Sequence, residues 1–429
     1  MTESAARPAL DPAERKSIRI RWFLVGFLVL GGVVNYLDRS TLSVANTTIA
    51  QEFELDALHM GLLLSAFSWP YAIANLPAGY LVDKLGPKRM FAFAAGAWSL
   101  VSMVTAAAGS FGALYAARVA LGIAESPFFT SALAVNERWF ARSERALPLS
   151  LVNTGSQIAN AIAPPVLTLL LVTMSWRGMF LVVGALGIVI AVVWLRIYRD
   201  PTLREHAMIA GDAARARVSA SAEKVGWGSL LAQPNTWFMV IGAFGIFSTV
   251  WVYLTWLPSY LQTARGFSLA ESGGVAALPF LCGIVGVLFG GWLSTRLIRR
   301  GMSTVLSRKI PIVAGALLAS AAVLPLAYVD STPLAIALLS LGYFASQVPI
   351  GCLWTLASDL APPRQVASLG AIQNFGGFIG AAVAPVVTGA ILTATGGDYT
   401  VVFLVGGVLL LVGAVSYGFF VKDRSTSAS

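Results

Sequence analysis

The chain has 429 residues, of which 57% are hydrophobic and only 11% are charged, and its formal net charge is +9. A soluble domain carries about 25% charged residues, whereas the apolar residues here form runs long enough to cross a bilayer, which excludes a soluble enzyme and a disordered chain. Because the basic residues lie in short loops between these runs, the net charge does not indicate a nucleic-acid binder. We predict an all-α protein embedded in the lipid bilayer.

Twelve apolar segments follow one another along the chain, each near the length of about 20 residues that a transmembrane helix needs. They cover 22–50, 58–82, 90–108, 111–136, 146–173, 178–198, 236–262, 271–295, 310–329, 333–358, 366–394 and 400–421. The longest polar stretch divides them into six and six. We therefore predict a tail (1–21), a six-helix bundle (22–198), a linker (199–235), a second six-helix bundle (236–421) and a second tail (422–429).

The basic residues predict the orientation of these helices. Most of the 29 Lys and Arg residues lie in the two tails and in every second loop. By the positive-inside rule, both termini and the linker are cytoplasmic. The short loops and termini favour the inner membrane of a bacterium.

The two bundles carry an internal repeat. Residues 153–166 and 374–387 share Asn, Gly, Ile, Ala, Ala, Pro and Val at matching positions, which equates the fifth span with the eleventh. Tyr36-Leu37 and Tyr253-Leu254 equate the first with the seventh, and Pro127 and Pro349 equate the fourth with the tenth. Repeated six-helix halves are typical of transporters in which two bundles rock about a central site.

Signatures of catalysis are missing from the sequence. It has no Gly-x-x-x-x-Gly-Lys-Ser/Thr phosphate loop, no Gly-x-Ser-x-Gly turn and no metal-spaced set of His, Cys, Asp and Glu residues. We expect no cofactor, no metal and no enzymatic activity.

Four ionisable residues lie inside predicted spans of the first half. Asp38 and Arg39 occur in the first span, and Arg118 and Glu125 occur in the fourth, seven residues apart on one helix face. Each costs about 2.5–3.5 kcal/mol at mid-bilayer on insertion scales. The four residues could form salt bridges that only hold the first and fourth spans together, as a structural staple. Apolar packing, however, would join these helices without the desolvation cost. The cluster therefore favours a proton or substrate site.

The second half keeps the architecture without the charges. At the matching positions, Asp38, Arg39, Arg118 and Glu125 become Thr255, Trp256, Ser340 and Gln347. It offers instead neutral groups: Tyr253, Trp256, Gln347, Trp354 and Asn374. In the fifth span, Asn153, Gln157 and Asn160 form one polar stripe. The stripe either lines a cavity or joins helices, and each aromatic ring taken alone also suits ordinary packing.

These residues resemble the major facilitator superfamily and, within it, the anion:cation symporter family, over roughly 20–422. The superfamily loop motif reads Gly79 to Arg89, and a degenerate copy runs from Gly291 to Arg300 with Thr295 in place of Asp83. The narrower signature is Asn35-Tyr36-Leu37-Asp38-Arg39, supported by Arg118-x6-Glu125 and by Trp139-Phe140 followed by Glu144-Arg145. The bacterial galactonate, glucarate and hexuronate transporters are the most similar branch.

The resemblance implies import of a small organic anion with protons by a monomer, with sodium coupling left open. Asp38 and Glu125 would be the protonatable pair, and Arg39 and Arg118 would bind the carboxylate. Further pocket residues implied are Tyr36, Tyr71, Gln157 and Asn374, to which the second half adds Trp256, Gln347 and Trp354. Asp83, Lys84 and Arg89 would latch the cytoplasmic side, although the two basic residues also suit simple positive-inside anchoring.

We expect Asp38 and Glu125 to neutralise Arg39 and Arg118, so that protonating one carboxyl frees a guanidinium for an incoming carboxylate. Alternatives are a transporter of another anion (an aromatic acid, tartrate, phosphate or glutamate), a drug:proton antiporter, a membrane sensor and a membrane enzyme. The buried arginines argue against cationic drugs, and the linker is short for a signalling domain.

Overall fold

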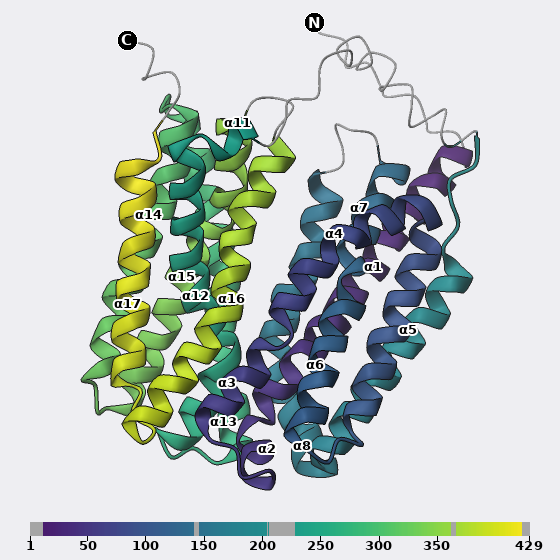
Figure 1. Cartoon of the computed structure of the whole chain (residues 1–429). Helices are drawn as coiled ribbons and strands as arrows, with labels where there is room; N and C mark the ends of the chain where they lie inside the picture. Colours follow the sequence, from purple (N-terminus) through teal and green to yellow (C-terminus); the bar gives the residue numbers. More distant parts are fainter. Residues whose placement is uncertain (1–11, 141–145, 204, 206–227, 362–365, 423–429) are drawn as a thin grey trace, which may run out of the picture.

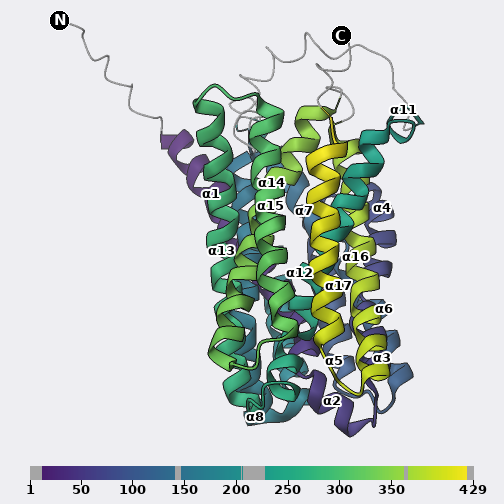
Figure 2. The ribbon, with the colours of Figure 1, turned by 90° about the vertical axis from the view of Figure 1, so that its left-hand side faces the viewer.

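The computed structural model describes residues 12–140, 146–203, 205, 228–361 and 366–422, which are helical nearly throughout and contain no strand. Much of the predicted linker, the outer parts of both tails and the Glu144-Arg145 pair lie outside these ranges. The helices run along a shared direction, with the start of α1 and the end of α17 at one end of the molecule (Figures 1 and 2).

The helices of the first half precede the linker and those of the second half follow it. The first half comprises α1 (Pro12–Val44), α2 (Asn46–Glu52), α3 (Ala57–Ser65), α4 (Ser68–Leu85), α5 (Pro87–Thr105), α6 (Phe111–Glu125), α7 (Pro127–Trp139) and α8 (Ala146–Ile197). The second half comprises α11 (Gly228–Leu231), α12 (Pro234–Thr263), α13 (Leu269–Arg299), α14 (Thr304–Val323), α15 (Thr332–Leu360), α16 (Val366–Thr395) and α17 (Thr400–Val415). Short 3-10 and π segments, Leu324–Ala327 and Ser416–Phe420, extend α14 and α17.

Among the described residues, ten helical segments are long and apolar enough to cross a membrane. One of them, α8, contains two predicted spans, because the chain leaves helical geometry at Ser175, where φ is 69°. The predicted span 90–108 is helix α5, which is not among the ten. Every predicted span therefore has a helix, although apolar length alone does not yield the full count of twelve.

Local chemistry determines several helix boundaries. The predicted first span, 22–50, is wrong at its end, because α1 stops at Val44 and α2 begins after Ala45. Gly86 separates α4 from α5 with a φ of 81°, a conformation that glycine adopts without steric cost. Ser110 caps α6 by accepting a hydrogen bond of 3.2 Å from the Ala113 amide. The cap fixes the start of the helix that carries Arg118 and Glu125.

The two halves meet along a seam at the end of the molecule away from the termini (Figure 1). Here α3 and α4 pack against α16, α8 packs against α13, and α1 packs against α12. Hydrogen bonds between described residues cross the seam: Ser43 to the Thr255 carbonyl (2.9 Å), Thr47 to Gln262 (2.7 Å), the Leu58 amide to Thr393 (3.0 Å) and Ser65 to the Ala382 carbonyl (2.6 Å). The seam closes this end of the protein.

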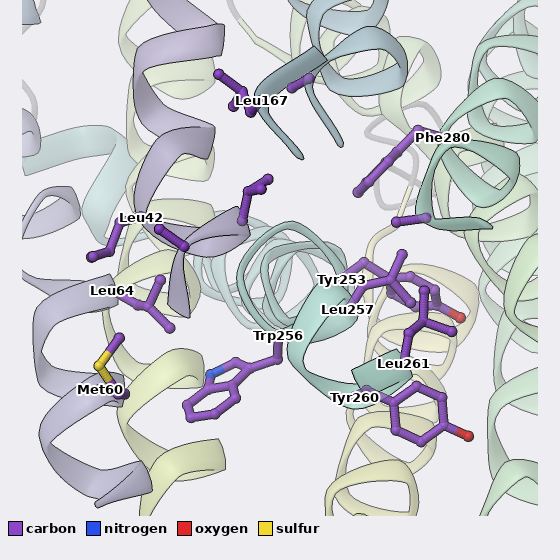
Figure 3. Packing of buried hydrophobic residues seen from close by; sticks show 14 of the residues in the cluster. Leu42, Met60, Leu64, Leu167, Tyr253, Trp256, Leu257, Tyr260, Leu261 and Phe280 are labelled. Carbon is purple, nitrogen blue, oxygen red and sulfur yellow. The ribbon is translucent and has the colours of Figure 1, made fainter. Parts of the chain in front are cut away.

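Apolar side chains of both halves fill the seam. Figure 3 shows Leu42, Met60 and Leu64 of the first half on one side and Tyr253, Leu257 and Phe280 of the second half on the other. Trp256 reaches between them from α12 and is 2% exposed. Burying such side chains stabilises an interface by about 1.5–3 kcal/mol each relative to exposure. The seam is therefore a packed core and not a loose contact.

Candidate functional site

An ion pair joins α1 to α6 in the interior of the first half. Arg39 Nε donates to Glu125 Oε2 at 2.6 Å, and Glu125 is completely buried. Aromatic rings surround the guanidinium of Arg39, which lies 4.6 Å from the rings of Tyr36 and Phe67 and 4.7 Å from that of Tyr71. Such cation–π contacts strengthen when they are desolvated. The rings therefore hold Arg39 in place even when its carboxylate partner is neutral.

The other two charged residues, Asp38 and Arg118, do not form an ion pair with each other. Ser102 of α5 donates to one carboxylate oxygen of Asp38, which is completely buried. Arg118 donates to the Thr41 hydroxyl at 3.3 Å, and Thr41 donates in turn to the Asp38 carbonyl at 2.6 Å. Within the described part of the chain, Arg118 forms no ion pair. Arg39 therefore pairs directly with Glu125, whereas the head of Arg118 meets a hydroxyl. That the two acids neutralise both arginines stays a prediction.

Several buried polar atoms of this cluster have no hydrogen-bond partner among the described residues. They are Asp38 Oδ2, Arg39 NH2, Glu125 Oε1 and both amide atoms of Asn35. A structural staple would satisfy its members, because a buried polar atom left unpaired costs about 1–3 kcal/mol. The cluster is arranged instead as a polar site with capacity for further partners.

A cavity of about 40 Å³ lies between the halves beside this cluster. Both arginines line it, together with Tyr36 and Asn160 of the first half and Trp251, Leu254 and Thr255 of the second. Trp251 and Leu254 were missed by sequence reasoning. The available signal was the repeat, since Trp251 lies one helical turn before Thr255, the counterpart of Asp38. Two guanidinium groups therefore line one cavity, and their charge and geometry suit a carboxylate.

Of the predicted pocket residues, Tyr71 lies next to the cluster. Its ring contacts Arg39 and also Phe378 of α16, at a centroid distance of 5.5 Å. Asn374 lies one turn before Phe378 on the same helix face, and Gln157 lies one turn before the cavity-lining Asn160 on α8. Both are partly buried. The structure thus brings these three residues to the level of Arg39 or one turn away from it.

The remaining predicted pocket residues lie elsewhere in the second half. Trp256 lines a separate apolar cavity of about 250 Å³ within that half, bordered by α12, α16 and α17. Gln347 is buried against α13, where a Cβ on Gly286 would lie 3.2 Å from its Cβ. Trp354 is 44% exposed further along α15. None of the three lines the cavity between the halves in this conformation, so their part in binding stays a prediction.

The predicted latch residues lie at the junction of α4 and α5. Asp83, Lys84 and Arg89 are exposed, and within the described ranges none of them forms an ion pair. Nearby, Arg138 of α7 contacts Asp200 at 2.6 Å after the end of α8. Arg199 donates to both carboxylate oxygens of Glu205, which lowers the pKa of that carboxyl to about 2. The first pair joins α7 to the segment after α8, and the second lies within that segment.

Comparison with known proteins places this geometry in context. The family model of the Major Facilitator Superfamily matches residues 28–385. A probable L-galactonate transporter of Escherichia coli (strain K12) is 37% identical over 414 residues, covering 94% of this chain and 90% of that protein. A probable galactarate/D-glucarate transporter of Bacillus subtilis (strain 168) is 32% identical, covering 95% of this chain and 91% of that protein.

A solved structure shows the same fold. The bacterial homolog to the human lysosomal transporter Spinster matches with a TM-score of 0.76 at 19% identity, covering 92% of this chain and 96% of that one. The comparisons confirm the predicted all-helical membrane fold and the predicted resemblance.

Proposed function

The chain belongs to the Major Facilitator Superfamily, and from this premise we propose that it imports a sugar acid together with protons by alternating access. Similar proteins are named as transporters of galactonate and of galactarate and glucarate, so the chain is a transporter and not an enzyme. The observation that carries the proposal is the pair of arginines, Arg39 and Arg118, on one cavity beside two buried acids.

Charge balance suggests how proton and substrate binding are linked. The four groups Asp38, Arg39, Arg118 and Glu125 sum to zero when all are ionised. One proton on Glu125 and one carboxylate between the arginines leave the sum at zero, so the loaded site carries no excess charge into the bilayer interior. By reciprocal linkage, each ligand then strengthens binding of the other.

Each residue has a distinct part in this cycle. Arg118, which donates to the Thr41 hydroxyl and forms no ion pair among the described residues, offers the first contact to a carboxylate. Protonation of Glu125 releases the Arg39 guanidinium, which its aromatic surroundings keep in position for paired hydrogen bonds. Asn160 and Tyr36 on the cavity wall, with Gln157 and Asn374 close by, supply neutral partners for the hydroxyl groups of a sugar acid.

The packed seam supports alternating access. With the termini in the cytoplasm, as the basic loops predict, the seam closes the periplasmic side, and this conformation faces inward. The exposed Asp83, Lys84 and Arg89 agree with a cytoplasmic latch that is released in this state. Because the cavity is built from both halves of one chain, we propose that the monomer transports in the inner membrane of a bacterium.

The test is uptake of labelled galactonate, glucarate and glucuronate into proteoliposomes with an inward proton gradient. We expect accumulation of at least one of them, and we expect Glu125→Gln to abolish accumulation while substrate exchange continues. Asp330→Asn is a matched control, since the Asp330 carboxyl is exposed and only its backbone carbonyl is engaged, by Arg265. In a second set of measurements, uptake of the same labelled acids is followed under a sodium gradient without a proton gradient.

Two outcomes would contradict the proposal. If Glu125→Gln concentrates the substrate as the unchanged protein does, Glu125 is not the coupling acid. If accumulation follows the sodium gradient alone, the coupling ion is sodium and the proton step is wrong.

A further inference from the structure

A hollow of about 420 Å³ lies where α13 ends, far from the cavity between the halves. It is lined by Gly291, Trp292, Thr295, Arg296, Arg299 and Arg300, which form the second copy of the loop motif. α12 runs from the end of the molecule that holds the termini toward the seam, so α13 returns and ends beside the termini (Figure 1). The hollow therefore lies where the predicted bilayer meets the cytoplasm.

Positive charge in this hollow is not balanced by protein. Arg296, Arg299 and Arg300 are exposed, and among the described residues none of them forms an ion pair. Asp359, a carboxylate of the neighbouring α15, contacts Arg308 instead, at 3.4 Å. Cations at a helix C-terminus suit the helix dipole, but the dipole does not account for a hollow walled by three of them. The site therefore has the charge to hold an anion.

An exposed apolar stripe leads along α13 to the hollow. Leu281, Val285, Leu288 and Trp292 are 50%, 58%, 68% and 54% exposed. Their spacing of four, three and four residues places them on one helix face, and Arg296 and Arg299 continue that face by one and two turns. Arg296 lies over the Trp292 ring, 5.5 Å from its centroid. An apolar surface that ends in tryptophan and arginine matches a molecule with hydrocarbon chains and an anionic head.

We propose that this hollow binds the headgroup of an anionic phospholipid, with the phosphate between Arg296, Arg299 and Arg300 and the acyl chains along the stripe. The stripe favours a membrane lipid over free phosphate, because a free ion makes no use of an apolar face 12 residues long. Basic pockets beside transmembrane helices on the cytoplasmic side suit such headgroups.

A difference at one position between the two copies of the loop motif explains why the second copy is the lipid site. The first copy has Asp83 where the second has Thr295. A carboxylate at that position repels a phosphate, whereas the Thr295 hydroxyl is neutral and donates locally to the Gly291 carbonyl at 2.9 Å. Thr295 is exposed, so Thr295→Asp adds the charge of the first copy without burying it.

The experiment is native mass spectrometry of the full chain in detergent, titrated with dioleoylphosphatidylglycerol or dioleoylphosphatidylcholine. We expect a first phosphatidylglycerol to bind more tightly than phosphatidylcholine. Each change of one charge, in Arg296→Gln or Thr295→Asp, should weaken phosphatidylglycerol binding about fivefold, since a basic residue near an anionic surface contributes on the order of 1 kcal/mol. Binding of phosphatidylcholine should be unaffected.

Arg196→Gln is the matched control. Arg196 lies in the last turn of α8, is exposed and follows the exposed apolar residues Val192 and Val193, but it is not among the residues that line the hollow. The proposal is wrong if the two lipids bind equally, or if Arg196→Gln weakens phosphatidylglycerol as much as Arg296→Gln does. It is also wrong if inorganic phosphate displaces the lipid at equal concentration, which would assign the hollow to a free ion. If Arg296→Gln does not fold, phosphatidylglycerol binding by Thr295→Asp alone tests the proposal.

Discussion

The two halves of this protein share one architecture but differ in what they bury. In the first half, α1 and α6 carry four ionisable side chains into the interior, and one ion pair of 2.6 Å joins the helices. In the second half, the matching positions hold Thr255, Trp256, Ser340 and Gln347, and a cavity of about 250 Å³ there is lined mainly by apolar residues. The first half therefore contains the buried charges, and the second half contributes neutral side chains to the cavity between the halves.

The difference shows how a duplicated fold can divide its tasks. Buried charge is costly and must be compensated nearby, so four groups on two adjacent helices are easier to balance than the same groups spread across two moving bodies. The second half approaches the cluster with Trp251, Leu254 and Thr255, which can shift during transport without separating an ion pair. Each of the following substitutions tests one side of this division.

The largest effect is expected where a charge is removed from the first half. Arg118→Gln should weaken binding of the transported sugar acid by roughly thirtyfold or more, because losing one partner of a buried charge pair costs about 2–5 kcal/mol. Ser340→Ala, at the matching position of the second half, should change binding little. Isothermal titration of the purified variants measures both, with thermal unfolding as the check on folding. Equal losses in the two variants would show that the halves contribute alike.

A smaller effect is expected where a charge is added to the second half. Gln347 is 2% exposed and packs against α13, so Gln347→Glu places a carboxyl in the interior without a cationic partner and should lower the melting temperature. The number of protons moved per substrate should stay the same, because Gln347 does not line the cavity beside the charged cluster. A ratio measured from pH and substrate fluxes that increases in this variant would refute the assignment of coupling to the first half.

The sequence predicts much of this arrangement because buried charge is costly and therefore conspicuous in an apolar helix. Asp38, Arg39, Arg118 and Glu125 are found in this way, and the repeat identifies their neutral counterparts. The pairing within the cluster depends on helix rotation and packing, so Arg39 pairs with Glu125 while Arg118 meets Thr41. Trp251 is not predicted, because the sequence does not distinguish an aromatic residue that lines a cavity from one that packs in the hydrophobic core.

Helix interruptions are predicted less well than charges. The break at Ala45 has no proline or glycine at that position to announce it, and α1 therefore ends earlier than its apolar pattern indicates. The break between the fifth and sixth spans is visible because polar residues interrupt the apolar run, and it falls at Ser175. The sequence does not predict the seam, because its contacts join helices that lie far apart in the chain.

The smallest effect is expected at the seam itself, where neither half contributes charge. A Cβ on Gly61 of α3 would lie 2.5 Å from the Pro385 carbonyl oxygen and 3.1 Å from the Val386 Cα, both backbone atoms of α16. Gly61→Ala should therefore hinder closure at this end and shift the population toward the state that is open there, while the charged cluster remains intact. Substrate affinity should change less than in Arg118→Gln.

Spin labels at Glu54 and Asp398, exposed residues of the loops beside α3 and α16, report the separation of the halves at this end. The labels are attached in a background without Cys282 and Cys352, the two free cysteines. We expect Gly61→Ala to lengthen the distance between the two labels, measured by double electron–electron resonance. Gly96→Ala on α5 is the matched control, since a Cβ there meets no atom within 4 Å. Unchanged distances in Gly61→Ala would mean that the seam can yield by at least about half an ångström at this contact. Closure would then depend on the apolar side chains around Trp256 and not on backbone contact.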